Sequence, residues 1–379
     1  MRAKGSFSVA AYESRAKTIA TVGRGSATFE GEERVRQGKG LDSLVDPKER
    51  GVIRMSNNLL VPEGDRFVLK FGVAMPVKTD IDTTGSMGGN VNIAFAVQPK
   101  VQNLLIQGKS AVLQRYHTQM ATGAVQDEGD NFAYEVSQFE PDNEVERQMG
   151  LLVPERRGGD TPEEYQVGIF STAYLTKSSI TEYGLRGYYF PVGDVWGREQ
   201  FNRTLLERVF GDKVLELAFG KNPPKSLPST EEAAKEMLQN WHSFFLQVGN
   251  DTYSKTWWGK VLGEERFIRL PRTESLAEVQ AVIIGLTEGV LDLQTAVDYL
   301  REAKVSADEA KKIVNACAGI PIGLQKTFPN FDKIPMAGAK FASREDIWPI
   351  GAKGAVPASK SDKGKKPAPK DKKKESWKV

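Results

Sequence analysis

Cysteine and histidine are nearly absent from this chain of 379 residues. The single cysteine, Cys317, excludes an intrachain disulfide and suits a reducing compartment. It lies in an apolar helical run, which favours a buried, inert thiol. The two histidines, His117 and His242, have no Cys or His neighbour at ligand spacing, which argues against a zinc site. They also give no basis for a Ser-His-Asp or Cys-His catalytic arrangement.

Long apolar runs are missing as well. No segment approaches the roughly 18 apolar residues that a membrane-spanning helix needs, so we expect no membrane span. The first twenty residues are partly basic but hold no continuous apolar stretch, and we therefore expect no signal peptide. A hydrophobic content of 40% with 27% charged residues is ordinary for a globular protein with a sizeable core. The simplest expectation is a cytoplasmic protein.

Positive charge is concentrated at one end of the chain. The net charge is +3, but residues 352–379 hold ten lysines against three acidic residues, which leaves about −4 on the rest. Nucleic-acid binding by the folded body is therefore not indicated. The lysine-rich end has too few apolar residues to form a core, and we expect it to be a disordered, solvated tail. The alternative is that it attracts nucleic acid or anionic surfaces through charge.

Predicted strands alternate with predicted helices through the middle of the chain. The strands cover residues 67–77, 131–136, 187–192, 242–248 and 266–270, and the helices cover residues 91–106, 161–175, 199–217, 230–240 and 275–286. This alternation predicts an α/β fold with a doubly wound, mainly parallel sheet and helices on both faces. Two later helices, over residues 292–303 and 306–318, predict a C-terminal helical hairpin, with Ser306 and Glu309 as a capping box.

These patterns divide the chain into five parts. The predicted parts are a partly irregular N-terminal arm (1–65), an α/β domain (66–290), the helical hairpin (291–320), an extended segment (321–349) and the disordered Lys-rich tail (350–379).

Three short segments place oxygen ligands after or between predicted strands. They are residues 82–87 (Asp-Thr-Thr-Gly-Ser-Met), residues 158–163 (Gly-Gly-Asp-Thr-Pro-Glu) and residues 193–194 (Gly-Asp). In an open parallel sheet, the loops beyond the carboxyl ends of the strands converge on one crevice, where ligands bind. A carboxylate with hydroxyls at alternate positions suits a hard cation such as Mg²⁺ or Mn²⁺. Because hydroxyl ligands are neutral, such an ion would still attract an outside carboxylate.

The first segment, Asp82-Thr83-Thr84-Gly85-Ser86, resembles the Asp-x-Ser/Thr-x-Ser signature of the metal-ion-dependent adhesion site of von Willebrand factor A domains. The other two segments are most similar to the bacterial and alpha-kinase-associated branch, which has a Gly-Gly-Asp-x-Pro-Glu loop and a strand followed by Gly-Asp. The resemblance covers roughly residues 66–286. It implies a metal site whose ligands are Asp82, Thr84, Ser86, Thr161 and Asp194, with Asp160 as the alternative to Thr161.

The resemblance also implies a function. It indicates a divalent-metal-dependent protein-binding adaptor and no enzyme, in which an Asp or Glu of a partner completes the coordination of Mg²⁺ or Mn²⁺. Such domains often act with ATPases of the AAA+ class, so an AAA+ ATPase is one candidate partner. Two alternatives stay open: a metal-dependent hydrolase with Asp160 or Asp130 as general base, and a structural or nucleic-acid-associated protein that acts through its lysine tail.

Other conspicuous residues favour structural interpretations. We interpret Glu163 and Glu164 as solvated acids in the first turn of a helix. The acidic run Asp127, Glu128 and Asp130 favours a solvated loop over a part of the metal rim. The pair Trp257-Trp258 favours packing against helices over an exposed contact patch.

Overall fold

The computed structural model describes much of the chain between Phe29 and Ala342. The described residues are 29–50, 53–54, 60–69, 73–106, 111–113, 116–141, 144–158, 161–177, 180, 185–325, 335 and 338–342. The predicted tail (350–379) and Asp160 lie outside them.

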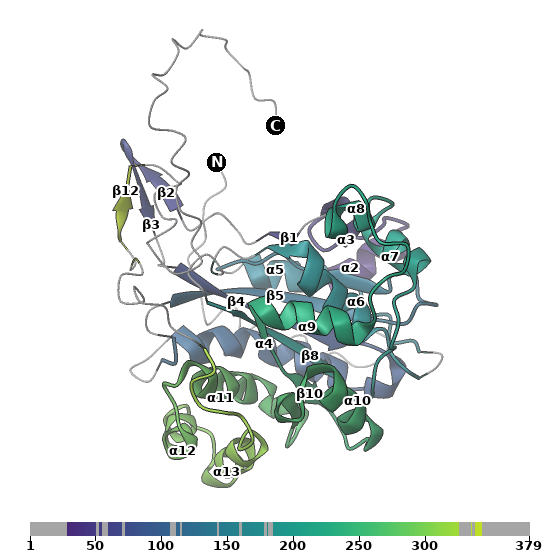
Figure 1. Cartoon of the computed structure of the whole chain (residues 1–379). Helices are drawn as coiled ribbons and strands as arrows, with labels where there is room; N and C mark the ends of the chain where they lie inside the picture. The colour runs from purple at the N-terminus through teal and green to yellow at the C-terminus, as the bar shows by residue number, and fades with distance from the viewer. Residues whose placement is uncertain are drawn as a thin grey trace.

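A mainly parallel sheet forms the centre of the molecule (Figure 1). Its strands are β4 (Val73–Asp82), β5 (Tyr116–Val125), β6 (Tyr134–Val136), β8 (Gly187–Gly193), β9 (Trp241–Ser243), β10 (Phe245–Gln247) and β11 (Phe267–Arg269). The order across the sheet is β11-β10-β8-β4-β5-β6, and β9 pairs with β8 beside β10. Among the described strands of this sheet, only the β5–β6 pair is antiparallel.

The strand order is that of a doubly wound fold. With β9 and β10 taken as one interrupted strand, the order in chain numbering is 3-2-1-4-5-6. The chain winds outward to one side from β4 and to the other side from β8. The order therefore reverses between β4 and β8, which makes their carboxyl ends the switch point at which ligands bind in such sheets. The predicted α/β class and parallel sheet are confirmed.

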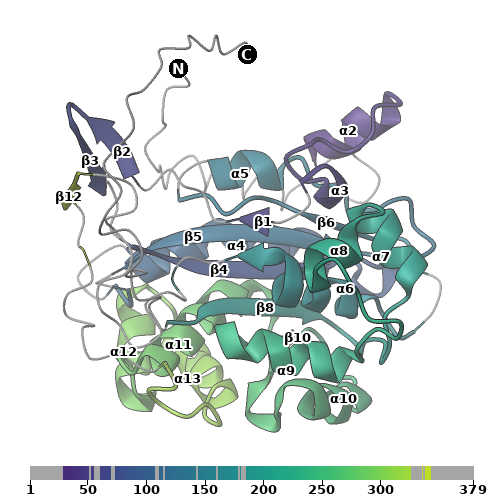
Figure 2. The ribbon, with the colours of Figure 1, turned by 45° about the horizontal axis from the view of Figure 1, so that its top comes forward.

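Helices cover both faces of the sheet (Figures 1 and 2). One face carries α4 (Asn90–Ile106) and α11 (Leu276–Glu288), and the hairpin of α12 (Leu293–Glu302) and α13 (Ala307–Ala316) packs on α11. The other face carries α5 (Glu144–Met149), α6 (Tyr165–Phe170), the π-helical turn η3 (Ser171–Leu175) and α9 (Thr230–Asn240). Further helices are α7 (Arg203–Phe210), α8 (Val214–Phe219) and α10 (Tyr253–Leu262), with short turns η2 (Gly85–Met87), η5 (Glu264–Arg266) and η6 (Thr273–Ser275). Among the helices described, none has both the length and the apolar character needed to cross a membrane.

The described part of the N-terminal arm holds two helices that the sequence patterns did not predict. They are α2 (Glu30–Arg36) and α3 (Pro47–Arg50). Phe29 anchors α2, because its ring is buried and meets Phe95 of α4 edge-on at 5.3 Å. Gly31 allows the close approach on the other side: a Cβ atom there would lie 2.0 Å from the carbonyl oxygen of Leu151. The helix is therefore fixed by contacts with residues far along the chain.

The predicted strand over residues 67–77 is divided between two sheets. Its first part is β3 (Arg66–Leu69), which pairs antiparallel with β2 (Leu60–Glu63) and β12 (Lys340–Phe341) in a small sheet. Its second part opens β4, which pairs parallel with β5 and β8. Because the two parts pair with different strands, the prediction of one continuous strand over residues 67–77 is wrong. Another short pair joins β1 (Ile53–Arg54) to β7 (Thr176–Lys177).

The helix predicted from Thr161 begins at Tyr165. The residues before it are held in a loop, because the backbone N–H of Glu163 donates to the carbonyl oxygen of Trp196 at 3.0 Å. This bond ties the second predicted ligand segment to the loop after β8, so Glu163 and Glu164 are not residues of a first helical turn.

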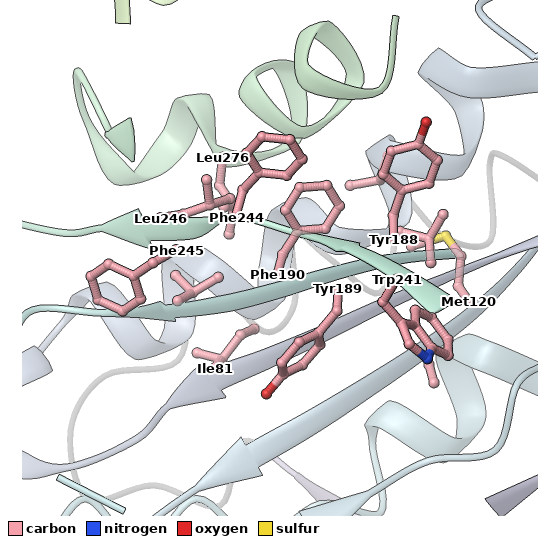
Figure 3. Packing of buried hydrophobic residues seen from close by; sticks show 14 of the residues in the cluster. Ile81, Met120, Tyr188, Tyr189, Phe190, Trp241, Phe244, Phe245, Leu246 and Leu276 are labelled. Atoms are coloured by element: carbon pink, nitrogen blue, oxygen red, sulfur yellow. The ribbon is translucent and has the colours of Figure 1, made fainter. Parts of the chain in front are cut away.

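Aromatic residues fill the layers between sheet and helices. Tyr188 and Phe190 point to one face of β8 and Tyr189 to the other, as strand alternation requires (Figure 3). Trp257 and Trp258 are buried, which rules out the exposed contact patch; Trp258 stacks on Phe245 of β10 with ring centroids 4.1 Å apart and meets Tyr165 of α6 edge-on. Cys317 is also buried, and burial raises its thiol pKa to about 12.

Glu288 at the end of α11 predicts a dependence of stability on pH. Its Oε1 accepts hydrogen bonds from Tyr188 Oη (2.6 Å) and Gln325 Nε2 (3.1 Å), while burial raises its pKa to about 7. The folded state thus favours the protonated acid. The contribution of Glu288 to the free energy of unfolding is therefore fully present below its pKa in the unfolded state, and it is lost as the pH rises through 7.

Glu288→Gln is therefore expected to raise the free energy of unfolding at pH 8.5, by at most about 3 kcal/mol from the pKa difference. At pH 5 the gain should shrink to below about 1 kcal/mol. Urea unfolding at both pH values measures this, with the exposed Glu274→Gln as the control. An equal gain at both pH values would contradict the assignment.

Candidate functional site

The crevice at the switch point is built on alternate residues of β4. Lys78, Asp80 and Asp82 follow one another at every second position, so they share one face of the strand, and all three are fully buried. Asp82 is the last residue of β4, and Asp194 directly follows β8 in the neighbouring position. The first and third predicted segments therefore end at the same point of the sheet.

The loop after β4 folds around the carboxylate of Asp82. Asp82 Oδ1 accepts hydrogen bonds from the backbone N–H of Thr84 (2.8 Å) and from Thr84 Oγ1 (2.7 Å). Thr84 Oγ1 lies 3.1 Å from Ser86 Oγ. Asp82 and Thr84 are buried, whereas Ser86 is exposed at the mouth of the crevice. The alternating residues thus form a connected series of oxygens that leads from the sheet to the surface.

Asp194 joins this series from the loop after β8. Burial raises the pKa of the Asp194 carboxyl group, and the neighbouring Ser86 hydroxyl opposes that shift. Burial also raises the pKa of Asp82, and the negative charge of Asp194 raises it further. The structure therefore brings together Asp82, Thr84, Ser86 and Asp194, four of the five predicted ligands; that they bind a metal stays a prediction.

The second predicted segment contributes Glu163 to the crevice, although the sequence was interpreted as placing this residue in solvent. Thr161 is exposed, and its role as a ligand stays a prediction. Glu163, two residues later, is 3% exposed. Burial raises its pKa, and the charges of Asp82, Asp127 and Asp194 add to the effect. The interpretation of Glu163 as a solvated helix-start acid is therefore wrong.

Asp127, after β5, is the other residue that sequence reasoning misjudged. It is 5% exposed and lies close enough to Glu163 to raise the pKa of that residue, so the expectation of a solvated loop is wrong for this position. Asp130 is also buried, and its Oδ2 accepts a hydrogen bond from the backbone N–H of Asp127 at 3.2 Å. The signal in the sequence was position: Asp127 lies just beyond the end of a central strand, near where Asp82 ends β4 and Asp194 follows β8, but the strand before Asp127 was not predicted.

Tyr165 orients Asp82 from the opposite side. Its hydroxyl donates to Asp82 Oδ2 at 2.5 Å, and its ring packs edge-on against Phe245 and Trp258. Gly193 makes room for this hydroxyl, because a Cβ atom at that position would lie 1.7 Å from Tyr165 Oη. Both oxygens of Asp82 are therefore fixed by hydrogen bonds.

The donor set of the crevice fits a hard cation. Asp194 Oδ1 and Glu163 Oε2 are buried oxygens without a hydrogen-bond partner among the described residues. The charge of Asp194 raises the pKa of Asp82, and the charges of both raise the pKa of Glu163, so a bound cation would relieve this repulsion. Within the described residues, no three His, Cys, Asp or Glu side chains are grouped so that they could hold a metal ion by themselves. A cation here would also need the hydroxyls of Thr84 and Ser86, and oxygen ligands of this kind suit Mg²⁺ or Mn²⁺.

A buried ionic cluster lies beneath the crevice on the same face of β4. Asp80 Oδ2 accepts hydrogen bonds from Tyr134 Oη and Tyr189 Oη, both at 2.9 Å, and lies 3.1 Å from Lys78 Nζ. Lys78 Nζ also donates to Thr172 Oγ1 of the π-helical turn at 2.7 Å. Burial lowers the pKa of Lys78, and the charge of Asp80 opposes that shift. The cluster ties β4 to the helix layer that carries Tyr165.

Of the comparisons with known proteins, the one with solved structures found similar chains. No protein-family model matches the chain, and no curated protein matches it. Among the similar structures are the pilus adhesin SpaC from Lactobacillus rhamnosus GG, with 14% identity and a TM-score of 0.37, and proximal thread matrix protein 1 from the mussel byssus with a zinc-occupied MIDAS motif, with 12% identity and a TM-score of 0.35. A third is a von Willebrand factor type A protein from Catenulispora acidiphila, with 11% identity and a TM-score of 0.33.

The matched region covers 58%, 57% and 58% of this chain, respectively, and 32%, 48% and 44% of those proteins. This chain therefore spans less than half the length of each. The topology and the site described above follow from this chain's own strand order and contacts.

Proposed function

We propose that this chain is a divalent-cation-dependent protein-binding module of the von Willebrand A type. Asp82, Thr84, Ser86 and Asp194 would hold Mg²⁺ or Mn²⁺ at the switch point, with Thr161 as a further hydroxyl. The ion would supply a Lewis-acidic position for a carboxylate from a protein partner. The proposal includes no catalytic step, and an AAA+ ATPase is one candidate partner.

One observation carries the proposal: the alternating oxygens of the first loop form a hydrogen-bonded series at the switch point, and the carboxylate of the third loop lies close enough to raise the pKa of Asp82. The series ends at exposed Ser86, so the position that a partner would occupy faces solvent. Tyr165 holds Asp82 in place through a short hydrogen bond, which fixes the inner end of the site before any ion binds. This preorganisation supports a binding role.

The proposed role predicts that an outside carboxylate displaces water from the bound ion. Water-proton relaxation of Mn²⁺ added to the protein measures this, because a ligand that replaces metal-bound water lowers the relaxation enhancement. We expect the peptide acetyl-Gly-Asp-Gly-amide to lower the enhancement and acetyl-Gly-Asn-Gly-amide to leave it unchanged. Equal effects of the two peptides would sink the partner-carboxylate proposal, even if Mn²⁺ binds.

A further inference from the structure

A groove adjoins the candidate metal site on the side of α2. Its volume is about 600 Å³, and its lining includes Glu32 and Arg36 of α2, Gly85 of the first loop, and residues 153–157. Gly85 stands between Thr84 and Ser86, and its backbone N–H donates to the carbonyl oxygen of Arg157 at 2.5 Å. Part of the wall of the groove therefore belongs to the first loop of the candidate metal site, and we name this feature the α2 groove.

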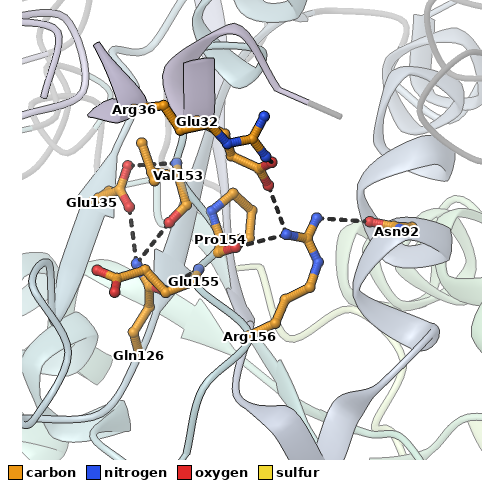
Figure 4. Close-up of polar contacts among 9 residues, drawn as sticks. All are labelled: Glu32, Arg36, Asn92, Gln126, Glu135, Val153, Pro154, Glu155 and Arg156. Carbon is orange, nitrogen blue, oxygen red and sulfur yellow. Dashed lines mark hydrogen bonds and ion pairs between the residues drawn. The ribbon is translucent and has the colours of Figure 1, made fainter. Parts of the chain in front are cut away.

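Hydrogen bonds hold the floor of the α2 groove in a fixed shape (Figure 4). The backbone N–H of Val153 donates to Glu135 Oε2 at 2.9 Å, and that of Glu155 donates to Gln126 Oε1 at 2.6 Å. Gln126 Nε2 in turn donates to the carbonyl oxygen of Val153 at 3.1 Å. A segment without regular secondary structure is thus fastened to the sheet at both ends.

Arg156 fastens the same segment to the helices. Its guanidinium donates to Glu32 Oε1 at 2.6 Å, to the carbonyl oxygen of Pro154 at 2.8 Å and to Asn92 Oδ1 at 3.1 Å (Figure 4). Its backbone has a φ of 55°, in the left-handed region that residues other than glycine rarely adopt. Its side-chain contacts hold this backbone conformation, so the shape of the groove is set by residues of this chain.

The charges that the groove presents to solvent are positive. The side chains of its two acids, Glu32 and Glu155, are only 10% and 7% exposed. Glu32 forms an ion pair with Arg156, and Glu155 accepts hydrogen bonds from residues 131 and 132. In contrast, the side chains of Arg36 and Arg157 are 51% and 68% exposed. Their ion pairs are long, from 3.6 to 3.9 Å, and exposed pairs of this kind contribute little to stability. Both guanidinium groups can therefore turn to a ligand at small cost.

We propose that the α2 groove binds a second acidic residue of the same partner segment, beside the carboxylate that completes the metal site. This inference rests on the proposed function and adds the chemistry of the partner: an extended segment with two acidic residues at a fixed spacing. The first carboxylate binds the ion, and the second meets Arg36 and Arg157, whose planar guanidinium groups match carboxylate geometry.

Selection from a random peptide display library tests whether bound segments carry two acidic residues at a fixed spacing. The full chain is immobilised with Mn²⁺, and bound peptides are released with EDTA. We expect the released peptides to share two acidic positions at one spacing. The double variant Arg36→Glu, Arg157→Glu should keep the first position and lose the acidic preference at the second. It should also bind the peptide selected on wild type about ten-fold more weakly, the value of one charge-assisted hydrogen bond.

The matched control reverses the same number of charges on the helical hairpin, with Arg301→Glu and Lys311→Glu, both exposed. Peptide affinity should then stay within about two-fold of wild type, because salt screens the effect of charges on the helical hairpin at the α2 groove. Mn²⁺ binding to the groove variant should be at least as tight as that of wild type, since neither arginine is a proposed ligand and the added negative charge nearby favours a cation. A consensus with one acidic position, or the same consensus for wild type and groove variant, would overturn the groove while leaving the metal site intact. No EDTA-released peptide at all would instead count against the proposed function and the groove together.

Discussion

Replacing Asp80 with alanine is expected to lower the free energy of unfolding by about 3–5 kcal/mol, the usual cost of removing one partner from a buried ion pair. The variant would leave the Lys78 ammonium without its carboxylate in a fully buried position, and two tyrosine hydroxyls without their acceptor. Urea unfolding followed by circular dichroism measures the loss.

The Lys78→Met change made in the Asp80→Ala background should recover part of that loss, because it removes the unbalanced charge. The exposed Asp298→Ala variant is the control and should stay within about 0.5 kcal/mol of wild type. If Asp80→Ala cost less than about 1 kcal/mol, the cluster would not be the support of β4 that its contacts indicate.

Mn²⁺ is expected to stabilise the folded protein by about 2.7 kcal/mol at one hundred times its dissociation constant, through binding to the folded state alone. Asp82→Asn should abolish this gain, because it removes the carboxylate at the inner end of the site. The variant keeps the size of the side chain and an oxygen that can accept from Thr84. Thermal unfolding with Mn²⁺ and with EDTA measures both proteins.

In EDTA, Asp82→Asn should stay within about 1 kcal/mol of wild type, because relief of the repulsion with Asp194 and Glu163 offsets the loss of the hydrogen bond from Tyr165. Loss of the Mn²⁺ effect together with retained stability would assign the effect to ion binding and not to damage of the fold. An undiminished Mn²⁺ effect in the variant would place the ion elsewhere.

The sequence predicted the sheet wherever a strand was apolar. The strand from 187 to 192 and the helix from 230 to 240 match β8 and α9 closely. In contrast, β5 was missed, although it is a central strand, because its fully buried residues include Thr118, Gln119 and Thr122. Such a strand shows neither an apolar run nor a clear alternation. Its polar groups are buried by tertiary contacts that a local pattern cannot show.

The candidate site could also be predicted only in part from the sequence. Asp82 ends one strand and Asp194 directly follows another, so the topology alone brings them together. Glu163 could not be placed, because its burial depends on a backbone hydrogen bond to Trp196, more than thirty residues away. The rim formed by α2 was equally hidden, since Phe29 and Gly31 are held by residues of α4 and the 150–152 turn.

Calorimetric titration of the full chain with Mn²⁺ and Mg²⁺, beside Asp82→Asn and the exposed Asp308→Asn, measures cation binding at the switch point. We expect one saturable site in wild type and in Asp308→Asn, and none in Asp82→Asn while its circular dichroism spectrum is retained. Absence of binding by the folded wild type, or equal binding by Asp82→Asn, would contradict a cation site at the switch point between β4 and β8.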